Sequence, residues 1–209
     1  MGVSETAAKR VLLSMTFPEL EADLIVRGAQ GDEAACAALF DAYYPAVLRL
    51  SLGLLNDLGD AEEVAQDAFV YALSRLDRYD PARSAFRTWL FTIALSRCRN
   101  KRRRKWPEIV PLEALGAAGA GAVPREVEQA LDRRGLRRQL WEAVQALPDA
   151  LREAVILRYL GDMRYREVAE TLDCNAKTAE SRVRLGLERL RRHFAGAEVE
   201  PALAEMLAW

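Results

Sequence analysis

The sequence predicts an all-α protein with two helical domains, joined by a flexible linker, and a helix-turn-helix in the second domain. Apolar residues recur at spacings of three and four, the helical period, and no segment shows the alternation of a β-strand. A tract rich in Gly, Ala and Pro interrupts this pattern between residues 107 and 132. The composition, 51% apolar and 29% charged over 209 residues, is typical of a soluble globular protein.

The first domain is expected over residues 19–106, after an N-terminal extension at residues 1–18 that shows no strong pattern. Pro18 indicates the start of a first helix, because proline fits the first turn of a helix. Asp32 is a candidate N-cap for a longer second helix. Pro45 should kink that second helix or split it, because proline has no amide to donate.

A third helix is expected from Asp60, which has the spacing of a capping box with Glu63. Acidic and amide side chains occupy its polar face, and apolar ones its other face. The loop that follows has Pro81 near its centre and carries Arg78 and Arg83. It leads directly into the most unusual stretch of the chain.

The stretch from Phe86 to Trp106 begins as an apolar helix and ends as a cationic one. Apolar residues fill two sides of its first half, which predicts packing against neighbours on both sides. The narrow polar strip left free consists of Thr88, Thr92, Ser96, Arg99 and Arg103. No carboxylate interrupts the basic run from Arg97 to Lys105. Such an end suits a polyphosphate backbone, and the alternative is a solvated helix terminus that complements the helix dipole.

The second domain is expected over residues 133–194, followed by a C-terminal extension at residues 195–209. Pro148 ends its first helix, and Asp149 is a candidate cap for the next. A short helix, a tight turn at residues 173–175 and a longer cationic helix then have the layout of a helix-turn-helix. The residues expected to face inward on the short helix are Tyr165, Val168, Ala169 and Leu172. Those on the last helix are Ala179, Val183, Leu187 and Leu190.

The opposite face of the last helix offers polar and basic side chains of the kind that contact DNA bases and phosphates. Asn175 is a candidate N-cap that leaves amides available for a phosphate. The full candidate set is Asn175, Lys177, Thr178, Ser181, Arg182, Arg184, Leu185 and Arg192. An ordinary helical hairpin is the alternative reading of this segment.

The charge and cysteine content limit the class of protein. The net charge is −1 and the pI about 6.0, which excludes a globally basic nucleic-acid binder. Cys36, Cys98 and Cys174 are isolated at apolar-periodic positions, and His193 has no ligand pattern around it, so neither a metal site nor another cofactor is expected. Free thiols indicate a reducing compartment, and no membrane span or clean signal peptide is apparent. We therefore expect a cytoplasmic protein.

No catalytic pattern stands out in the sequence. There is no phosphate-binding glycine loop, no Gly-x-Ser-x-Gly and no HExxH motif. The acidic residues lie as neighbours along one helix face, which favours solvation or a partner over acid–base catalysis. We expect neither an enzyme nor a small-molecule substrate.

Taken together, the motifs resemble those of a bacterial extracytoplasmic-function (ECF) sigma factor, which contains only conserved regions 2 and 4. The matching segments of the first domain are Ala29-Gln-Gly-Asp-Glu-Ala-Ala, Phe40-Asp-Ala-Tyr-Tyr, Asp60-Ala-Glu-Glu-Val-Ala-Gln-Asp-Ala-Phe, Arg78-Tyr-Asp-Pro and Phe86-Arg-Thr-Trp-Leu. Those of the second are Leu147-Pro-Asp-Ala-Leu-Arg-Glu-Ala-Val-Ile-Leu-Arg-Tyr and Tyr165-Arg-Glu-Val-Ala-Glu-Thr-Leu, with Thr178 and Ser181-Arg182 in the last helix.

The resemblance implies a promoter-specificity subunit that binds the beta and beta-prime subunits of core RNA polymerase. The residues implied for polymerase binding are Asp60, Glu62, Glu63, Gln66 and Asp67. Those implied for recognising and melting the −10 element are Arg78, Tyr79, Arg83, Thr88, Trp89, Thr92, Ser96, Arg99, Lys101, Arg102 and Arg103. The last helix would read the −35 element, and the acidic linker would extend toward the polymerase active site. An anti-sigma factor covering both domains is a further implied partner, and no membrane insertion is implied.

The last helix departs from the family pattern. Glu180 stands where Lys is usual, Leu185 stands where Arg is usual, and Glu188 also stands where a basic residue is common. Asp173 stands where the turn usually has Gly. Fewer cations weaken the attraction to phosphates, and an apolar Leu185 suits a thymine methyl group instead.

Two other functions fit parts of the sequence. A sigma mimic would bind an anti-sigma factor without touching DNA, but the basic run from Arg99 to Lys105 would then serve no purpose. An ordinary helix-turn-helix regulator would leave the first domain unexplained, and no dimerisation heptad is visible.

Overall fold

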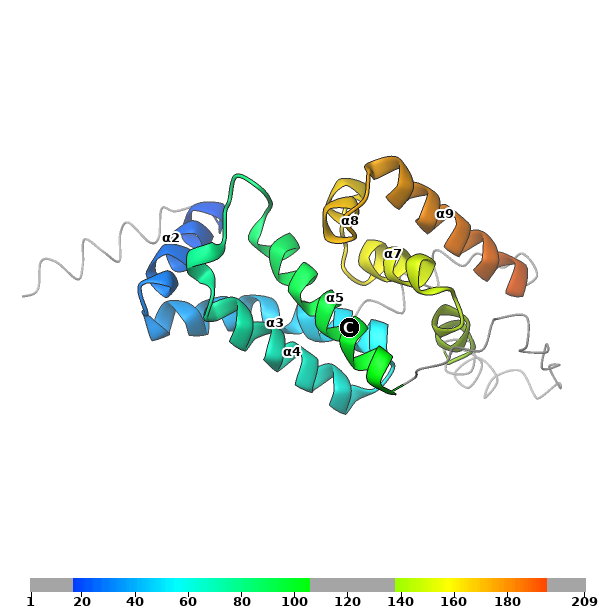
Figure 1. Ribbon diagram of the computed structural model, residues 1–209, viewed down its shortest axis with the longest axis horizontal. Helices are drawn as coiled ribbons and strands as arrows, with labels where there is room; N and C mark the ends of the chain where they lie inside the picture. Colours follow the sequence, from blue (N-terminus) through cyan, green and yellow to red (C-terminus); the bar gives the residue numbers. More distant parts are fainter. Residues whose placement is uncertain (1–16, 106–137, 195–209) are drawn as a thin grey trace, which may run out of the picture.

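The structure, a computed structural model, describes residues 17–105 and 138–194, which contain helices and no strand (Figure 1). We call these two ranges the first and the second lobe. The helices of the first lobe are α2 (Phe17–Ala29), α3 (Glu33–Leu55), α4 (Leu58–Leu73), the short 3-10 helix η1 (Leu76–Arg78) and α5 (Phe86–Lys105). The second lobe contains a helical segment at 138–145, α7 (Asp149–Tyr159), α8 (Tyr165–Thr171) and α9 (Ala176–His193). The all-α prediction is confirmed.

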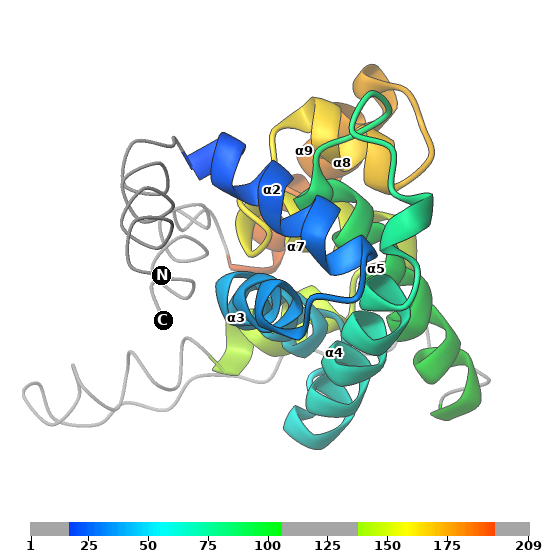
Figure 2. The ribbon, with the colours of Figure 1, turned by 90° about the vertical axis from the view of Figure 1, so that its left-hand side faces the viewer.

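Helix α3 is the central element of the first lobe, in contact with α2, α4 and α5 (Figure 2). Its N-cap is Asp32, as predicted, and the carboxylate accepts hydrogen bonds from the amides of Ala34 and Ala35 at 2.9 and 3.1 Å. Pro45 does not split the helix, so that part of the prediction is wrong. The proline itself is exposed, while Tyr43 and Val47 are buried on either side of it, and this packing outweighs the lost hydrogen bond.

Helix α4 begins at Leu58, earlier than predicted, because Asp57 rather than Asp60 is its N-cap. The Asp57 carboxylate accepts a hydrogen bond from the Asp60 amide at 2.9 Å. The capping box expected from Asp60 and Glu63 is therefore wrong. Both of those carboxylates instead bind lysines near the end of α5.

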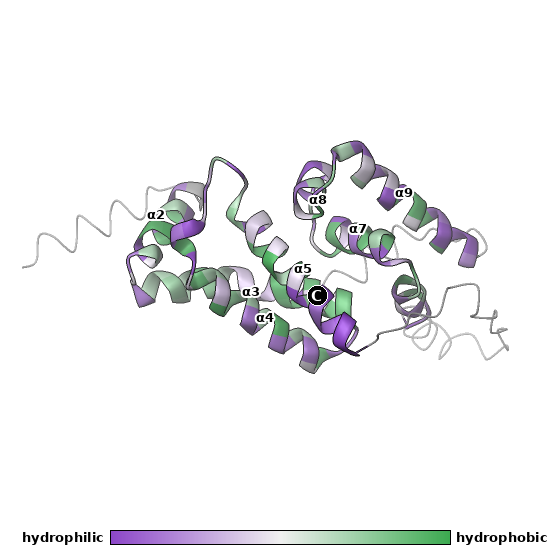
Figure 3. Cartoon of the chain, in the orientation of Figure 1, coloured by the Kyte–Doolittle hydropathy of each residue, from purple (hydrophilic) through white to green (hydrophobic). Residues whose placement is uncertain are grey.

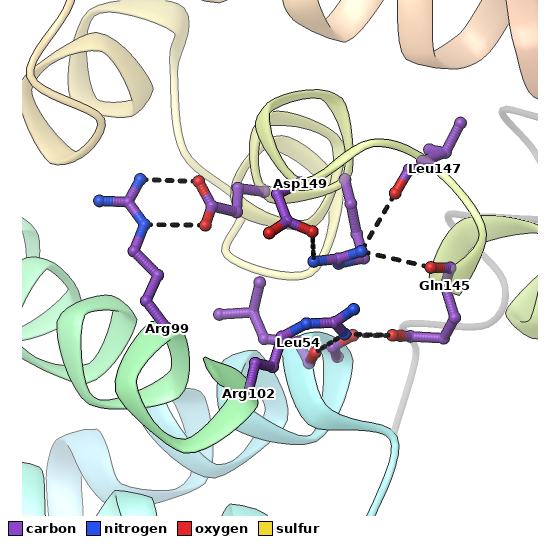
Figure 4. Close-up of polar contacts among 9 residues, drawn as sticks. Leu54, Arg99, Arg102, Gln145, Leu147 and Asp149 are labelled. Carbon is purple, nitrogen blue, oxygen red and sulfur yellow. Dashed lines mark hydrogen bonds and ion pairs between the residues drawn. The ribbon is translucent and has the colours of Figure 1, made fainter. Parts of the chain in front are cut away.

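In the second lobe, Pro148 occupies the N-cap of α7 and no side chain caps this helix, so the prediction for Asp149 is wrong. The Asp149 carboxylate pairs instead with Arg152, which is 1% exposed. Arg152 also donates to the carbonyl oxygens of Gln145 and Leu147 at 3.2 and 3.0 Å (Figure 4). A buried guanidinium thus satisfies carbonyls at the end of the preceding helical segment.

The helix-turn-helix consists of α8, a tight turn and α9. Asp173, in the turn, has φ 52°, a left-handed conformation in which glycine is at ease, and this explains why Gly is usual there in the family it resembles. Asn175 caps α9 as predicted, accepting from the Thr178 amide at 2.8 Å. The expected inward residues of α9 are all buried. Tyr165, which was expected to face inward from α8, is instead 39% exposed, and the Arg158 guanidinium lies 5.5 Å from its ring centre.

The two lobes pack against each other, α3 against α7 and α5 against α8. Gly53 of α3 lies at this interface, since a Cβ atom there would be 3.1 Å from the Ile156 side chain and 3.4 Å from that of Leu160. Hydropathy colouring shows apolar and polar residues interspersed along the helices of both lobes, and the end of α5 strongly hydrophilic (Figure 3). The expected extensions and linker lie outside the described residues, except for Phe17 and Pro18.

Within the part of the chain that the structure describes, α3 is the one helix long and apolar enough to cross a membrane by length and composition. A core helix passes the same test. Nine of its residues are buried against the rest of the fold, which is the behaviour of a core helix.

Candidate nucleic-acid interface

Helix α5 has a buried root, as predicted: Phe86, Leu90 and Leu95 are at most 1% exposed. Thr92, Ser96, Arg99 and Arg103 form an exposed line along it. Thr88, expected in the same line, is only 2% exposed, so that part of the prediction is wrong. The loop before α5 and helix α8 of the second lobe both border Thr88. Its hydroxyl oxygen has no hydrogen-bond partner among the described residues.

Thr88 borders a cavity of about 270 Å³ between the lobes. Residues 81–85, which include Arg83, form one wall, and Arg166, Glu167 and Glu170 of α8 form the other. Its walls thus combine cations, carboxylates and the unpaired Thr88 hydroxyl.

The aromatic residues Tyr79 and Trp89 are half-buried and pack with Phe86. Ring centres of Tyr79 lie 5.4 Å from both Phe86 and Trp89. The Tyr79 hydroxyl donates to the Ser84 carbonyl at 3.0 Å, which fixes the loop between them, and burial raises the pKa of Tyr79. Arg78 and Arg83 are exposed on this loop. The aromatic pair therefore supports the loop and still presents edges to solvent.

The cationic end of α5 is tied to the start of α4. Lys101 donates to Glu63 at 2.6 Å and lies 3.3 Å from Asp60, whose pKa is lowered chiefly by its hydrogen bond from Lys105. Lys101, implied for DNA binding, thus pairs within one lobe with Asp60 and Glu63, both implied for polymerase binding. The Asp60 side chain is only 14% exposed. The acidic and amide residues of α4 that remain exposed beyond this cluster are Glu62, Gln66 and Asp67.

Arg99 and Arg102, expected to be free for DNA, bind the second lobe instead (Figure 4). Arg99 donates to both oxygens of Glu153 at 2.8 and 2.7 Å, and these bonds raise its pKa. Arg102 donates to the Leu54 carbonyl at 3.1 Å and to the Gln145 side chain at 3.2 Å, and burial lowers its pKa. Neither Glu153 nor Gln145 was identified from the sequence.

Beside this contact lies an open cleft of about 600 Å³ between α5 and the second lobe. Ser96, Arg103 and Asn100 line it from α5, and Arg182 lines it from α9. Arg182 was expected to contact DNA with the rest of α9. In this arrangement it faces the first lobe instead.

The other candidates on α9 lie on its outer side. Lys177, Arg184 and Arg192 are exposed, and Leu185 is 41% exposed. Thr178 and Ser181 are half-buried at the first turns. The Asn175 Oδ1 atom accepts the capping bond, which leaves the Nδ2 group of this exposed residue and the first turn of α9 to meet a phosphate.

The thiols and acidic groups of the described residues form no cluster that could hold a metal ion. All three cysteines are free, and only Cys98 is fully buried. Burial raises the pKa of the Cys98 thiol to about 12, which makes it a poor nucleophile.

Comparisons with known proteins place both lobes in one protein family. The family model described as Sigma-70 region 2 matches residues 39–108, and the one described as Sigma-70, region 4 matches residues 137–190. The ECF RNA polymerase sigma factor RpoE of Cereibacter sphaeroides is 32% identical over 165 residues, covering 78% of this chain and 88% of that one. The ECF RNA polymerase sigma factor SigW of Bacillus subtilis is 28% identical over 175 residues, covering 79% and 91%.

Two solved structures share the fold. CnrH in complex with the cytosolic domain of CnrY has a TM-score of 0.63 at 23% identity, covering 86% of this chain and 99% of that one. The sigma factor RpoE in complex with the anti-sigma factor NepR, from Bartonella quintana, has a TM-score of 0.57 at 21% identity, covering 78% and 98%.

Proposed function

The chain belongs to the ECF sigma factors of RNA polymerase, and we propose that it directs promoter-specific initiation by binding core polymerase, reading the −10 and −35 elements and melting the −10 region. The observation that carries this function is the presence, in order, of both sigma regions with a cationic α5 and an exposed α9 face. The protein performs no bond chemistry itself and acts in the cytoplasm, where polymerase and promoters are.

The polymerase contact is assigned to the outer face of α4. Glu62, Gln66 and Asp67 are exposed there and make no ion pair with the described residues. Asp60 and Glu63 hold the lysines of α5, so their contribution is to position the two helices relative to each other. Charges on such a face steer a basic partner and set its register.

Melting the −10 element requires a base to leave the stack and enter a pocket, while its strand is held by cations and aromatic rings. We assign the base pocket to the first-lobe wall of the cavity at Thr88, where the unpaired hydroxyl lies buried and can meet a base edge only after the side chains that cover it move. Thr92, Ser96 and Arg103 continue from it as an exposed line on α5 that can follow a strand.

The −35 element is assigned to the exposed side of α9. Lys177 and Arg184 are placed for phosphates and base edges, and Leu185 is exposed where a thymine methyl group could meet it. A regulatory partner fits the same family: the solved relatives are complexes, one of them explicitly with an anti-sigma factor. We propose that an anti-sigma factor binds this chain as well.

The test adds the purified protein to core RNA polymerase on a library of promoter fragments and sequences the transcripts. Initiation at a defined set of promoters that share −10 and −35 elements is the expected result. Failure to initiate anywhere, combined with tight binding to an anti-sigma factor, would show a mimic. Sequence-specific binding to duplex DNA without polymerase would show an ordinary helix-turn-helix regulator.

A further inference from the structure

We propose that the free chain inhibits itself: its second lobe closes on the first and occupies the −10 DNA-binding surface of α5 until a partner opens it. This rests on the proposed function, because it assigns a state to the same −10 surface. The closed arrangement is the one described above, with α5 against α8 and α3 against α7.

The ion pair between Arg99 and Glu153 is the first ground for this proposal. The Nε and Nη2 groups of Arg99 donate to the two oxygens of one carboxylate, at 2.8 and 2.7 Å, which is the same forked geometry that binds a phosphate. Arg99 cannot hold a DNA strand and Glu153 with the same two donors. The carboxylate side chain is only 8% exposed, so it is committed to the lobe contact and not to solvent.

The cavity at Thr88 is the second ground. Three of its lining residues, Arg166, Glu167 and Glu170, belong to α8 of the second lobe. Arg87 of α5 also donates a hydrogen bond to the Gly161 carbonyl just before α8. The second lobe therefore covers the proposed base pocket as well as the strand-binding arginine, and two carboxylates stand where the DNA would pass.

The lobe contact at Gly53 is the third ground, and it is independent of charge. The absence of a side chain there lets Ile156 and Leu160 approach α3, and the Gln145 side chain donates to the Gly53 carbonyl at 2.7 Å. Even a Cβ atom here would press on Ile156, so a side chain as large as leucine should push the lobes apart. This offers a steric way to open the chain that alters no proposed DNA-binding residue.

The experiment opens the full-length chain by two unrelated substitutions, Glu153→Gln and Gly53→Leu. Each has a matched control that makes the same change away from the lobe contact: Glu142→Gln, whose carboxylate pairs only locally with Arg138, and Gly59→Leu, at an open position near the start of α4. Small-angle X-ray scattering gives the radius of gyration. Fluorescence anisotropy gives the affinity for a labelled 12-nucleotide single-stranded DNA of mixed sequence at low salt.

Both opening variants should have a larger radius of gyration and bind the single strand about tenfold more tightly, if about one free chain in ten is open. The controls should match the unmodified protein. Unchanged compactness, or opening without tighter DNA binding, would overturn the proposal; so would equal tightening in Glu142→Gln, which would mean a general charge effect. A folding defect in one variant leaves the other as the test. Loss of promoter-specific initiation by the unmodified protein would instead refute the proposed function and leave closure standing.

Discussion

At position 88 the fold buries a hydroxyl group and gives it no hydrogen-bond partner among the described residues. A buried polar group without a partner costs about 1–3 kcal/mol, so a purely structural threonine would be a poor choice there. The spacing of α5 alone places Thr88 in line with Thr92 and Ser96. Its burial could not be predicted, because the covering residues come from a loop and from the second lobe.

The variant Thr88→Val should separate the effect of the hydroxyl on stability from its effect on promoter melting. The valine keeps the shape and removes the unpaired hydroxyl, so the free energy of unfolding should rise by about 1 kcal/mol. Promoter melting, followed by permanganate reactivity of unpaired thymines, should fall about tenfold, the effect of losing one hydrogen bond to a base. Thr171→Val, at a buried hydroxyl bonded to the Met163 sulfur, is the control and should leave melting unchanged. Equal promoter melting by both variants would show that the Thr88 hydroxyl does not contact a base.

Cys98 predicts a specific loss of stability at alkaline pH. Its thiol has a pKa of about 12 in the folded chain, against 9.0 for a free thiol. Between these values the unfolded chain has lost the proton and the folded chain keeps it, so the free energy of unfolding falls as pH rises from about 9 towards 12. Urea unfolding across this pH range should show a steeper fall for the unmodified protein than for Cys98→Ala. Parallel curves would contradict the burial of this thiol.

At the scale of the element, the cationic end of α5 should attract DNA of any sequence, unlike the exposed line at Thr92 and Ser96. Arg103 and Arg104 are exposed at its cationic end and carry no sequence information. Replacing both with Gln should weaken binding to all promoters alike and reduce the salt dependence of single-strand binding by about 0.7 per arginine lost. The double variant Arg138→Gln and Arg164→Gln, at exposed arginines of the second lobe, is the control. Loss confined to some promoters would show that the end of α5 reads bases.

Helix α9 carries a prediction about base preference. If Leu185 contacts a thymine methyl group, Leu185→Arg should abolish a preference for A·T at one −35 position, a change of about 1–3 kcal/mol. Binding of polymerase holoenzyme to duplexes with A·T or G·C at each −35 position measures it. Leu58→Arg, at another exposed leucine, serves as the control. If Leu185→Arg leaves the preference between A·T and G·C unchanged at every −35 position, the assignment of Leu185 to a thymine methyl group is wrong.

The elements differ in how well their sequences predicted them. The inward face of α9 follows from regular spacing and is correct, since every member is buried. The starts of α4 and α7 were misplaced: Asp57 rather than Asp60 caps α4, and Pro148 rather than Asp149 occupies the N-cap of α7, where Asp149 pairs with Arg152. Pro45 was expected to kink or split α3, but the helix continues through it, and Tyr43 and Val47 beside it are buried in the lobe core. At these three positions the single-residue rules for caps and helix breakers gave the wrong result, whereas the regular apolar spacing of α9 gave the right one.

At the scale of the whole molecule, the order of domains could be predicted and their contact could not. Arg99 and Glu153 are 54 residues apart, and neither side chain is unusual in its own helix. One local signal did exist: Glu153 directly precedes the apolar run from Ala154 to Leu157, and a carboxylate buried with such a run needs a partner. Only the fold identifies that partner as a residue assigned to DNA.

The closed state should respond to salt as a whole. The Arg99 side chain is 47% exposed, so its pair with Glu153 is screened as ionic strength rises. The radius of gyration of the unmodified protein should therefore increase between 0.05 and about 0.5 M sodium chloride, a range over which the screening length falls several-fold. Glu153→Gln should show a larger and salt-independent radius. Identical salt profiles for the two proteins would show that a contact other than the Arg99–Glu153 pair holds the lobes together.

The acceptors at the lobe contact have a further consequence for how this protein could diverge. Arg87 and Gln145 reach the main-chain carbonyls of Gly161 and Gly53, two positions at which a side chain would press on neighbouring atoms, so these contacts restrict both positions to glycine. The pair of Arg99 and Glu153, by contrast, depends on two side chains, either of which a single nucleotide change can alter. After gene duplication, one such change could give a copy that is open without its partner. Sister sigma factors in one cell could thus acquire different thresholds for activation while keeping the same fold.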